Sequence, residues 1–312
     1  MEEMFDIEKF NIISDEENYY FFRSLEPGDI KDLEEGNIKD ENGKYIRLRT
    51  DRERWEETHS IKPRWNAEST VTLEEMYNHI KMHYSLETNC ISLSSNANVA
   101  RTYGETFSDK YVMIKVPKKE MGQRVYNAGQ YMLSEIAKKV QERIAQGNIP
   151  EEVLEDFKKI DEAKKSEDLK DIIRVKYTAP KGIDTSKSGM KKGIAYKAPL
   201  SRISSFQALD EEQTLEKNKI VAKLTILEQK GLMETLVPRI KTNSQLISTM
   251  GSAFASGEQI YYGDIEGDRI TDISKELLDM FALIQQTENQ DKQIVNELKT
   301  ELVKYITKGG KL

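Results

Sequence analysis

Cysteine and histidine are scarce in this sequence, and it has no long apolar run. The single cysteine among its 312 residues, Cys90, excludes an internal disulfide and indicates a reducing compartment. Cys90 stands in an apolar run, which predicts a small buried side chain rather than a reactive thiol. No stretch approaches the ~18 consecutive apolar residues of a membrane span, and the acidic start MEEMFDIEKF lacks a signal-peptide core. We therefore expect a soluble protein with no membrane partner, acting in the cytoplasm of its own cell or of a target cell.

Positive charge is in deficit as well, except in one segment. The formal net charge is −7, with 38% apolar and 32% charged residues, which is typical of a globular chain and argues against a protein that coats nucleic acid. Residues 172–202 are basic, and their cationic residues are Arg174, Lys176, Lys181, Lys187, Lys191, Lys192, Lys197 and Arg202. This segment is either a docking surface for nucleic acid or an acidic protein, or a solvated linker between helices.

Two of the three histidines have the spacing of a metal site. His79 and His83 are four residues apart on a helix that Thr72 and Glu75 are predicted to begin as a capping box. The intervening acid of a metalloprotease motif is missing, and only His59 remains as a further histidine. We therefore predict no metal and expect both histidines on the surface.

The stretch GSAFASGEQIYYGDIEGDRITDI, residues 251–273, contains one acid in a suggestive place. Small residues at 251–257 predict a flexible loop, and the strand-forming run that follows begins at Glu258. A carboxylate at the mouth of a strand, behind a movable loop, is a common way to direct an acid into a cleft. The alternative is a solvated residue at the edge of a sheet.

Two earlier stretches bear on that choice. The run YYFFRSL, residues 19–25, is an aromatic strand with Arg23 set into it, and buried arginines are rare unless they are paired or hold an anion. The run CISLSSNANVA, residues 90–100, is a strand that passes into a helix through hydroxyl residues. Between them, the Pro and Gly of residues 26–29 predict a turn.

In this order, the three stretches resemble the Arg–Ser–Glu class of the ADP-ribosyltransferase superfamily. ISLSSNANVARTYG is similar to the family's Ser-Thr-Ser signature and short helix, and GEQIYYGDI is similar to its catalytic-glutamate strand. The resemblance implies an α+β fold, with a split pair of small β-sheets around an NAD⁺ cleft. It also implies four parts: 1–135 and 246–275 as the core, 136–245 as a helical insert containing the basic segment, and 276–312 as C-terminal helices.

The resemblance also implies a role for each motif residue. Arg23 would hold the diphosphate of NAD⁺, which is a co-substrate here, and Ser92, supported by Ser94, would hydrogen-bond the glutamate or the nicotinamide ribose. Glu258 would bond the ribose 2′-hydroxyl and stabilise the oxocarbenium-like transition state. No metal is implied.

The identity of the acceptor is left open by the sequence. Family members that modify arginine carry Glu or Gln two residues before the catalytic Glu, and that position is Ser256 here. Another protein side chain or a nucleic acid is therefore expected as acceptor. Tyr103 and Phe107 are candidates for the aromatic residue that stacks on nicotinamide.

Proteins of this type with large inserts are commonly bacterial toxins, effectors or phage-defence components, some with an antitoxin or immunity protein. The rival hypothesis is a binding module that uses residues 172–202 together with residues 43–65. The latter segment is predicted to be largely irregular, with its arginines near Trp55 and Trp65. The two hypotheses differ in whether Glu258 lies near Arg23.

Overall fold

The structure is a computed structural model that describes residues 12–59, 70–82, 88–169, 211–232, 243–286 and 292–308. It combines α-helices with an antiparallel sheet, so the predicted α+β class is confirmed. The basic segment 172–202, Trp65 and His83 lie outside the described residues. Two compact units are present: described residues of Leu133–Arg202 and Ala208–Ser248 form one, and those of Glu2–Met132 and Thr249–Leu312 form most of the other.

The strands are β1 (Ile13–Ser14), β2 (Asn18–Ser24), β3 (Arg47–Leu48), β4 (Cys90–Ser94), β5 (Tyr111–Pro117), β6 (Val125–Asn127), β7 (Glu258–Tyr262), β8 (Ile265–Glu266) and β9 (Ile270–Ile273). The α-helices are α1 (Pro27–Glu34), α2 (Asp51–Thr58), α3 (Leu73–Met82), α4 (Ala97–Phe107), α5 (Ala128–Ala145), α6 (Glu151–Glu162), α8 (Glu211–Gln229), α10 (Asn243–Ser256), α11 (Lys275–Gln286) and α12 (Lys292–Thr307).

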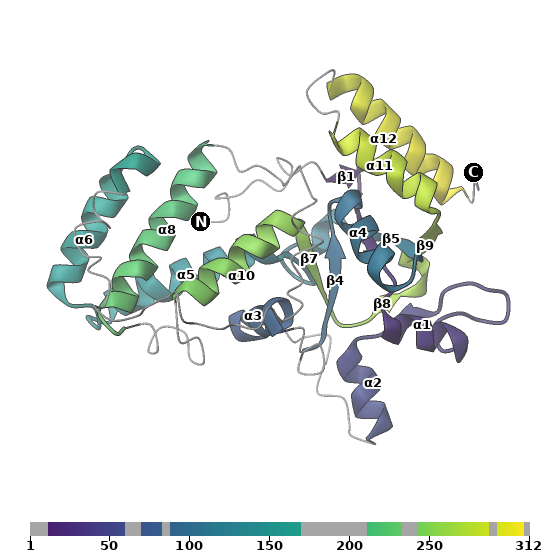
Figure 1. Cartoon of the computed structure of the whole chain (residues 1–312), viewed down its shortest axis with the longest axis horizontal. Coiled ribbons are helices and arrows are strands. Elements are labelled where there is room, and N and C mark those ends of the chain that lie inside the picture. The colour runs from purple at the N-terminus through teal and green to yellow at the C-terminus, as the bar shows by residue number, and fades with distance from the viewer. Residues whose placement is uncertain are drawn as a thin grey trace, which may run out of the picture. The chain divides into compact units, whose positions relative to one another are not determined.

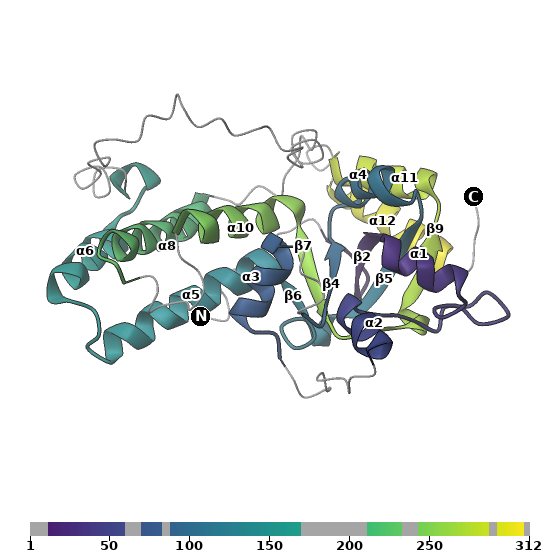
Figure 2. The same cartoon turned by 60° about the horizontal axis from the view of Figure 1, so that its bottom comes forward.

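The main sheet is a single path of strands with a narrow junction in it. Its order is β6-β7-β4-β2-β5-β9, with β1 also paired to β2, and its strands are labelled across Figure 1 and Figure 2. Strand β2 pairs with β5 along its whole length, but it meets β4 only at Phe22 and Ser94. The predicted pair of separate small sheets is therefore wrong as stated, because the strands form one sheet whose two halves join at one residue pair. A second, two-stranded sheet pairs β3 with β8.

One face of the main sheet is covered by the C-terminal helices. Side chains of β2 and β5, such as Phe22 and Met113, form one buried cluster with Leu278 and Phe281 of α11 and with α4 and α12. Figure 2 shows α4, α11 and α12 together on one side of the strands and α2 on the opposite side. This packing holds β2, β4 and β5 in place and leaves their other side to the elements that build the site.

The unit around α6 and α8 has a core of its own. Val153, Phe157 and Ile160 of α6 are buried, as are Leu224 and Leu227 of α8. The residues of α6 follow helical spacing, so this helix buries one stripe, whereas the buried residues of α8, which include Ala222 and Ile226, extend around more of the helix. Across the helix pair, Lys223 forms an ion pair with Asp161 at 2.6 Å.

Three sequence predictions about irregular segments are wrong. The predicted turn at 26–29 begins α1, because Pro27 fits the first helical turn and the Glu26 backbone N–H bonds Asp29 at 3.0 Å. Residues 51–58 form α2 within the segment predicted to be irregular, and Thr50 caps it. The predicted loop 251–257 belongs to α10 as far as Ser256, and Gly257, with φ of 59°, ends that helix.

Candidate active site

Ser92 and Glu258 meet across two neighbouring strands. Strands β4 and β7 are antiparallel, with Ser94 opposite Glu258 and Ser92 opposite Ile260. Side chains two residues apart lie on the same face of a strand, so Ser92 and Glu258 are diagonal neighbours. The Ser92 hydroxyl donates a hydrogen bond to Oε1 of Glu258 at 2.8 Å. The strand register therefore aims Glu258 at Ser92 and not at the solvent edge of the sheet.

Arg23 reaches the same serine from β2. Its Nη1 donates to the backbone carbonyl of Ser92 at 2.8 Å, close to the single pair that joins β2 to β4. The side chain is buried, with 7% exposed, and Nη2 forms an ion pair with Asp29 at 2.8 Å. Glu26, which is 41% exposed, lies 3.2 Å from Nη1. Arg23 thus links α1, β2 and β4, and its guanidinium has protein partners.

A network of buried charges lies beneath this link. Asp29 also pairs with Arg54 at 2.5 Å, and Asp32, one helical turn further along α1, pairs with Arg49 and Arg54. Burial opposes ionisation of Asp29, but the charges of Arg23 and Arg54 outweigh it, and the pKa of Asp29 lies below its usual value. Both aspartates are therefore charged at neutral pH, and the arginines are held in fixed positions.

The environment of Glu258 disfavours its charge. Burial raises the pKa of Glu258 to about 7, against the opposing hydrogen bond from Ser92. The negative charge of Glu26 raises this pKa further, and a hydrogen bond from Ser256 lowers it. A carboxyl group in this condition exchanges its proton near neutral pH, as groups in catalytic sites commonly do.

His79 was not expected in the site, and the prediction that it lies on the surface is wrong. Its ring is buried at the inner side of α3, with Nε2 2.9 Å from the Ser92 hydroxyl and Nδ1 2.8 Å from Oγ1 of Thr88. The sequence held one signal: His79 follows Met76 by three residues, so both share the apolar face of a helix. No group of metal ligands is found among the described residues.

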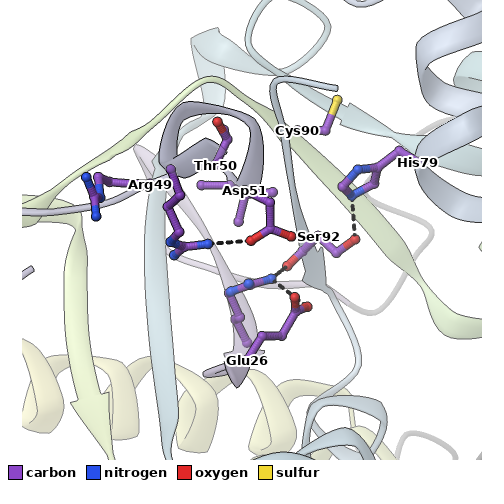
Figure 3. Close-up of a pocket in the computed structure, with 10 residues that line it drawn as sticks. Glu26, Arg49, Thr50, Asp51, His79, Cys90 and Ser92 are labelled. Atoms are coloured by element: carbon purple, nitrogen blue, oxygen red, sulfur yellow. Dashed lines mark hydrogen bonds and ion pairs between the residues drawn. The ribbon is translucent and has the colours of Figure 1, made fainter. Parts of the chain in front are cut away.

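Figure 3 shows the pocket at this point, with His79 directed at Ser92 from one side and Glu26 on another. It is lined by Arg23, Glu26, Arg49, Thr50, Asp51, Arg54, His79, Cys90, Ile91 and Ser92. Its volume, ≈ 20 Å³, suits a water molecule or one oxygen-rich group. Cys90 is buried as predicted, and burial raises the pKa of its thiol, so it stays protonated at neutral pH.

The remaining predicted site residues fall in two places. Ser94 is buried, and its hydroxyl lies 2.8 Å from the Ser256 carbonyl, where it fixes the end of α10 just before Glu258. Tyr103, on α4, has its pKa raised to about 12 by burial and by the charges of Glu258 and Glu26. Phe107 is 39% exposed and stacks on Tyr103, with the ring centres 6.4 Å apart.

Comparison of the chain with protein-family models, curated proteins and solved structures gives no match. Among the helices that the structure describes, none is both long and apolar enough to cross a bilayer.

Proposed function

We propose that this protein transfers ADP-ribose from NAD⁺ to a macromolecular acceptor. One observation carries the proposal: Arg23 and Glu258, 235 positions apart in the sequence, both contact Ser92 at 2.8 Å, one through its carbonyl and the other through its hydroxyl. The three residues that resemble the transferase motifs therefore converge on one point of one sheet. A glutamate at an outer edge, far from the arginine, would have favoured the binding-module hypothesis.

Glu258 and Ser92 would act on the nicotinamide ribose. The bond from C1′ to the nicotinamide nitrogen breaks, nicotinamide leaves with the electron pair as a neutral base, and the sugar acquires oxocarbenium character. Ionised Glu258, oriented by the Ser92 hydroxyl, stabilises that positive charge and bonds the 2′-hydroxyl. The acceptor nucleophile then bonds to C1′, and its proton passes to Glu258, whose pKa of about 7 suits that role.

The diphosphate of NAD⁺ would bind at the guanidinium groups that line the pocket. Glu26 is the exposed partner of Arg23, so an incoming phosphate oxygen can replace it at Nη1 while Asp29 still holds the rest of the side chain. Arg54 lines the same pocket. The pocket has room for about one water molecule, so the phosphate would enter it by displacing Glu26, and the nicotinamide would extend past Glu258 toward Tyr103 and Phe107.

The class of acceptor is inferred from the absence of a second acid or amide two residues before Glu258. Ser256, whose hydroxyl donates to the Ser252 carbonyl at 3.0 Å, stands where members that modify arginine have a second acid or amide. This favours a nucleic acid or a protein side chain other than arginine, in the setting of a bacterial toxin, effector or phage-defence protein. An antitoxin or immunity protein is a further expected partner.

The test is incubation of the purified chain with NAD⁺ labelled in its adenylate part, in cell lysate, followed by separate counting of protein and nucleic acid. Wild type should transfer label to one fraction, and Glu258→Gln should lower the rate about 10²–10³-fold through loss of transition-state charge stabilisation. Glu41→Gln, the same substitution at an exposed loop position, is the control and should match wild type. If wild type shows neither labelling nor nicotinamide release, the proposal is refuted and the binding-module hypothesis is favoured.

A further inference from the structure

Three side chains, one from α3, one from β4 and one from the segment just before β4, form a continuous hydrogen-bonded row that ends on Glu258. Thr88 Oγ1 lies 2.8 Å from His79 Nδ1, His79 Nε2 lies 2.9 Å from Ser92 Oγ, and Ser92 donates to Glu258 at 2.8 Å. Thr88 is fully buried and His79 nearly so. The row therefore runs along the wall of the pocket, which His79 and Ser92 both line, from the buried Thr88 to Glu258.

The proton positions in this row follow from donor and acceptor rules. A serine hydroxyl has one proton, and an ionised carboxylate can only accept, so the Ser92 proton is committed to Glu258. The Ser92 oxygen must then accept from His79, which requires a proton on Nε2. The Thr88 hydroxyl can serve Nδ1 as donor to the neutral ring or as acceptor from the charged one. Nε2 carries its proton in both charge states of His79.

The opposite tautomer would break the row. With the proton on Nδ1 alone, Nε2 becomes an acceptor and competes with Glu258 for the single proton of Ser92. Ionised Glu258 would then lose its donor within a buried site, where an unsatisfied charged group is costly. Thr88 is compatible with the Nε2-protonated ring, because its hydroxyl can donate to Nδ1.

We propose that His79 is a positioning residue for the transferase reaction. It donates from Nε2 to Ser92, and so directs the Ser92 hydroxyl proton to Glu258 at the moment when the sugar becomes positively charged. His79 touches neither NAD⁺ nor the acceptor in this role, and it acts through Ser92. Its effect on catalysis rests on the proposed function, whereas its tautomer and its hydrogen bond do not.

Two substitutions of His79 distinguish the effect of the hydrogen bond donated by Nε2 from the effect of the volume that the ring fills. A glutamine side chain places its amide nitrogen near the position of Nε2, and an asparagine side chain reaches only that of Nδ1. We expect His79→Asn to lower kcat for NAD⁺ turnover about tenfold with KM changed less than about twofold, as for one lost hydrogen bond. His79→Gln should retain at least about half of the wild-type kcat. The matched pair His59→Asn and His59→Gln, at the exposed residue that follows α2, should have no effect.

A double-substitution cycle tests whether His79 acts through Ser92. Ser92→Ala with His79→Asn should be no slower than Ser92→Ala alone, because the hydroxyl that His79 positions is gone. Additive losses in kcat, or equal losses for His79→Asn and His79→Gln, would overturn the proposal.

Nitrogen NMR of the ring provides a readout that needs no turnover. The chain has three histidines, so the spectrum of His79→Asn identifies the His79 signals by their loss. At about pH 8, where a free imidazole is neutral, we expect a protonated Nε2 whose shift changes in Ser92→Ala. An unprotonated Nε2 would overturn the proposal. A wild-type chain without NAD⁺ turnover would refute the proposed function instead, and the tautomer alone would then decide the role of His79.

Discussion

At the scale of single residues, Glu258 carries a conflict between charge and surroundings. Ionised, it accepts a hydrogen bond from Ser92, but burial and the charge of Glu26 favour its neutral form. Ionisation of Glu258 therefore lowers the stability of the folded state. This is expected of a carboxylate that must stabilise positive charge away from water. Both the reaction and the stability of the protein should therefore depend on this one pKa.

The rate of transfer should rise with pH through neutrality. The carboxylate form of Glu258 is the active one in the proposed reaction, and its pKa is raised to about 7. We expect kcat/KM for nicotinamide release to increase up to tenfold per pH unit below pH ~7 and to level off above pH ~8. The check is a pH–rate profile from pH 5 to 9. A profile that falls across this range would contradict the assigned role.

Replacing Glu258 should stabilise the fold at alkaline pH. The pKa is near 4.5 without the fold and about 7 within it, so the folded state binds more protons between these values and loses stability as pH rises through 7. Glutamine keeps the shape and cannot ionise. We expect the free energy of unfolding of Glu258→Gln to exceed that of wild type by roughly 1–3 kcal/mol at pH 8.

Urea unfolding at pH 5 and pH 8 measures this difference, which should be much smaller at pH 5, because it accumulates as pH rises from the unfolded pKa of 4.5 to the folded pKa of about 7. Equal gains at both pH values would mean that packing, and not charge, is responsible.

At the scale of elements, α4 is held unusually close to β5. A methyl group added at Gly104 would meet the ring of Tyr111 at 2.1 Å, and Tyr111 is buried with its hydroxyl bonded to Asp109 at 2.9 Å. The glycine thus permits a distance between helix and sheet that alanine does not. Because α4 also carries Tyr103 and begins next to β4, this spacing sets where the aromatic pair lies relative to Glu258.

Gly104→Ala should therefore destabilise the protein by about 1–3 kcal/mol in urea unfolding, as overpacking does. Gly251→Ala is the matched control, because Gly251 is also helical and nothing lies within 4 Å of its added methyl group. That substitution should stabilise by about 0.5–1 kcal/mol through helix propensity. Similar effects of the two substitutions would rule out close packing as the reason for Gly104.

At the scale of the whole molecule, a second carboxyl group adds to the pH dependence. Burial raises the pKa of Glu53, and its hydrogen bond with Asp264 and the charge of that residue raise it further, against the opposing charges of Arg47 and Arg49. Arg47 contacts both carboxyl groups, at 2.8 and 3.0 Å. This contact connects α2 to the turn after β7, two segments that are far apart in the sequence. Deprotonation of Glu53 places a second carboxylate beside Asp264 at this connection.

Global stability should consequently fall as pH rises above neutrality. The folded state retains the Glu53 proton to higher pH than the unfolded state does, so unfolding releases a proton and is favoured at high pH. We expect Glu53→Gln, which keeps a donor toward Asp264, to lose less stability than wild type between pH 5 and pH 9 in urea unfolding. Glu41→Gln should show the full wild-type loss, and an equal loss in Glu53→Gln would contradict the assignment.

The amino-acid sequence by itself determined the strands that carry the site. Alternation and β-branched or aromatic content are local properties, so β2, β4 and β7 were predicted close to their observed positions. Thr72 and Glu75 form the predicted capping box, with the Glu75 N–H bonded to Thr72 Oγ1 at 3.2 Å. Cys90 is buried, as its apolar neighbours indicated.

Only the tertiary structure decided which groups meet. Arg23 pairs with Asp29 because the residues predicted to form a turn begin α1 instead, and α1 carries that aspartate toward β2. His79 reaches Ser92 because α3 packs on the strands with that face inward. Periodicity shows that a face is buried but not what it faces, since partners far apart in sequence are chosen by packing of the whole chain. The convergence on Ser92 was therefore predictable as a hypothesis, and its hydrogen-bonded row was not.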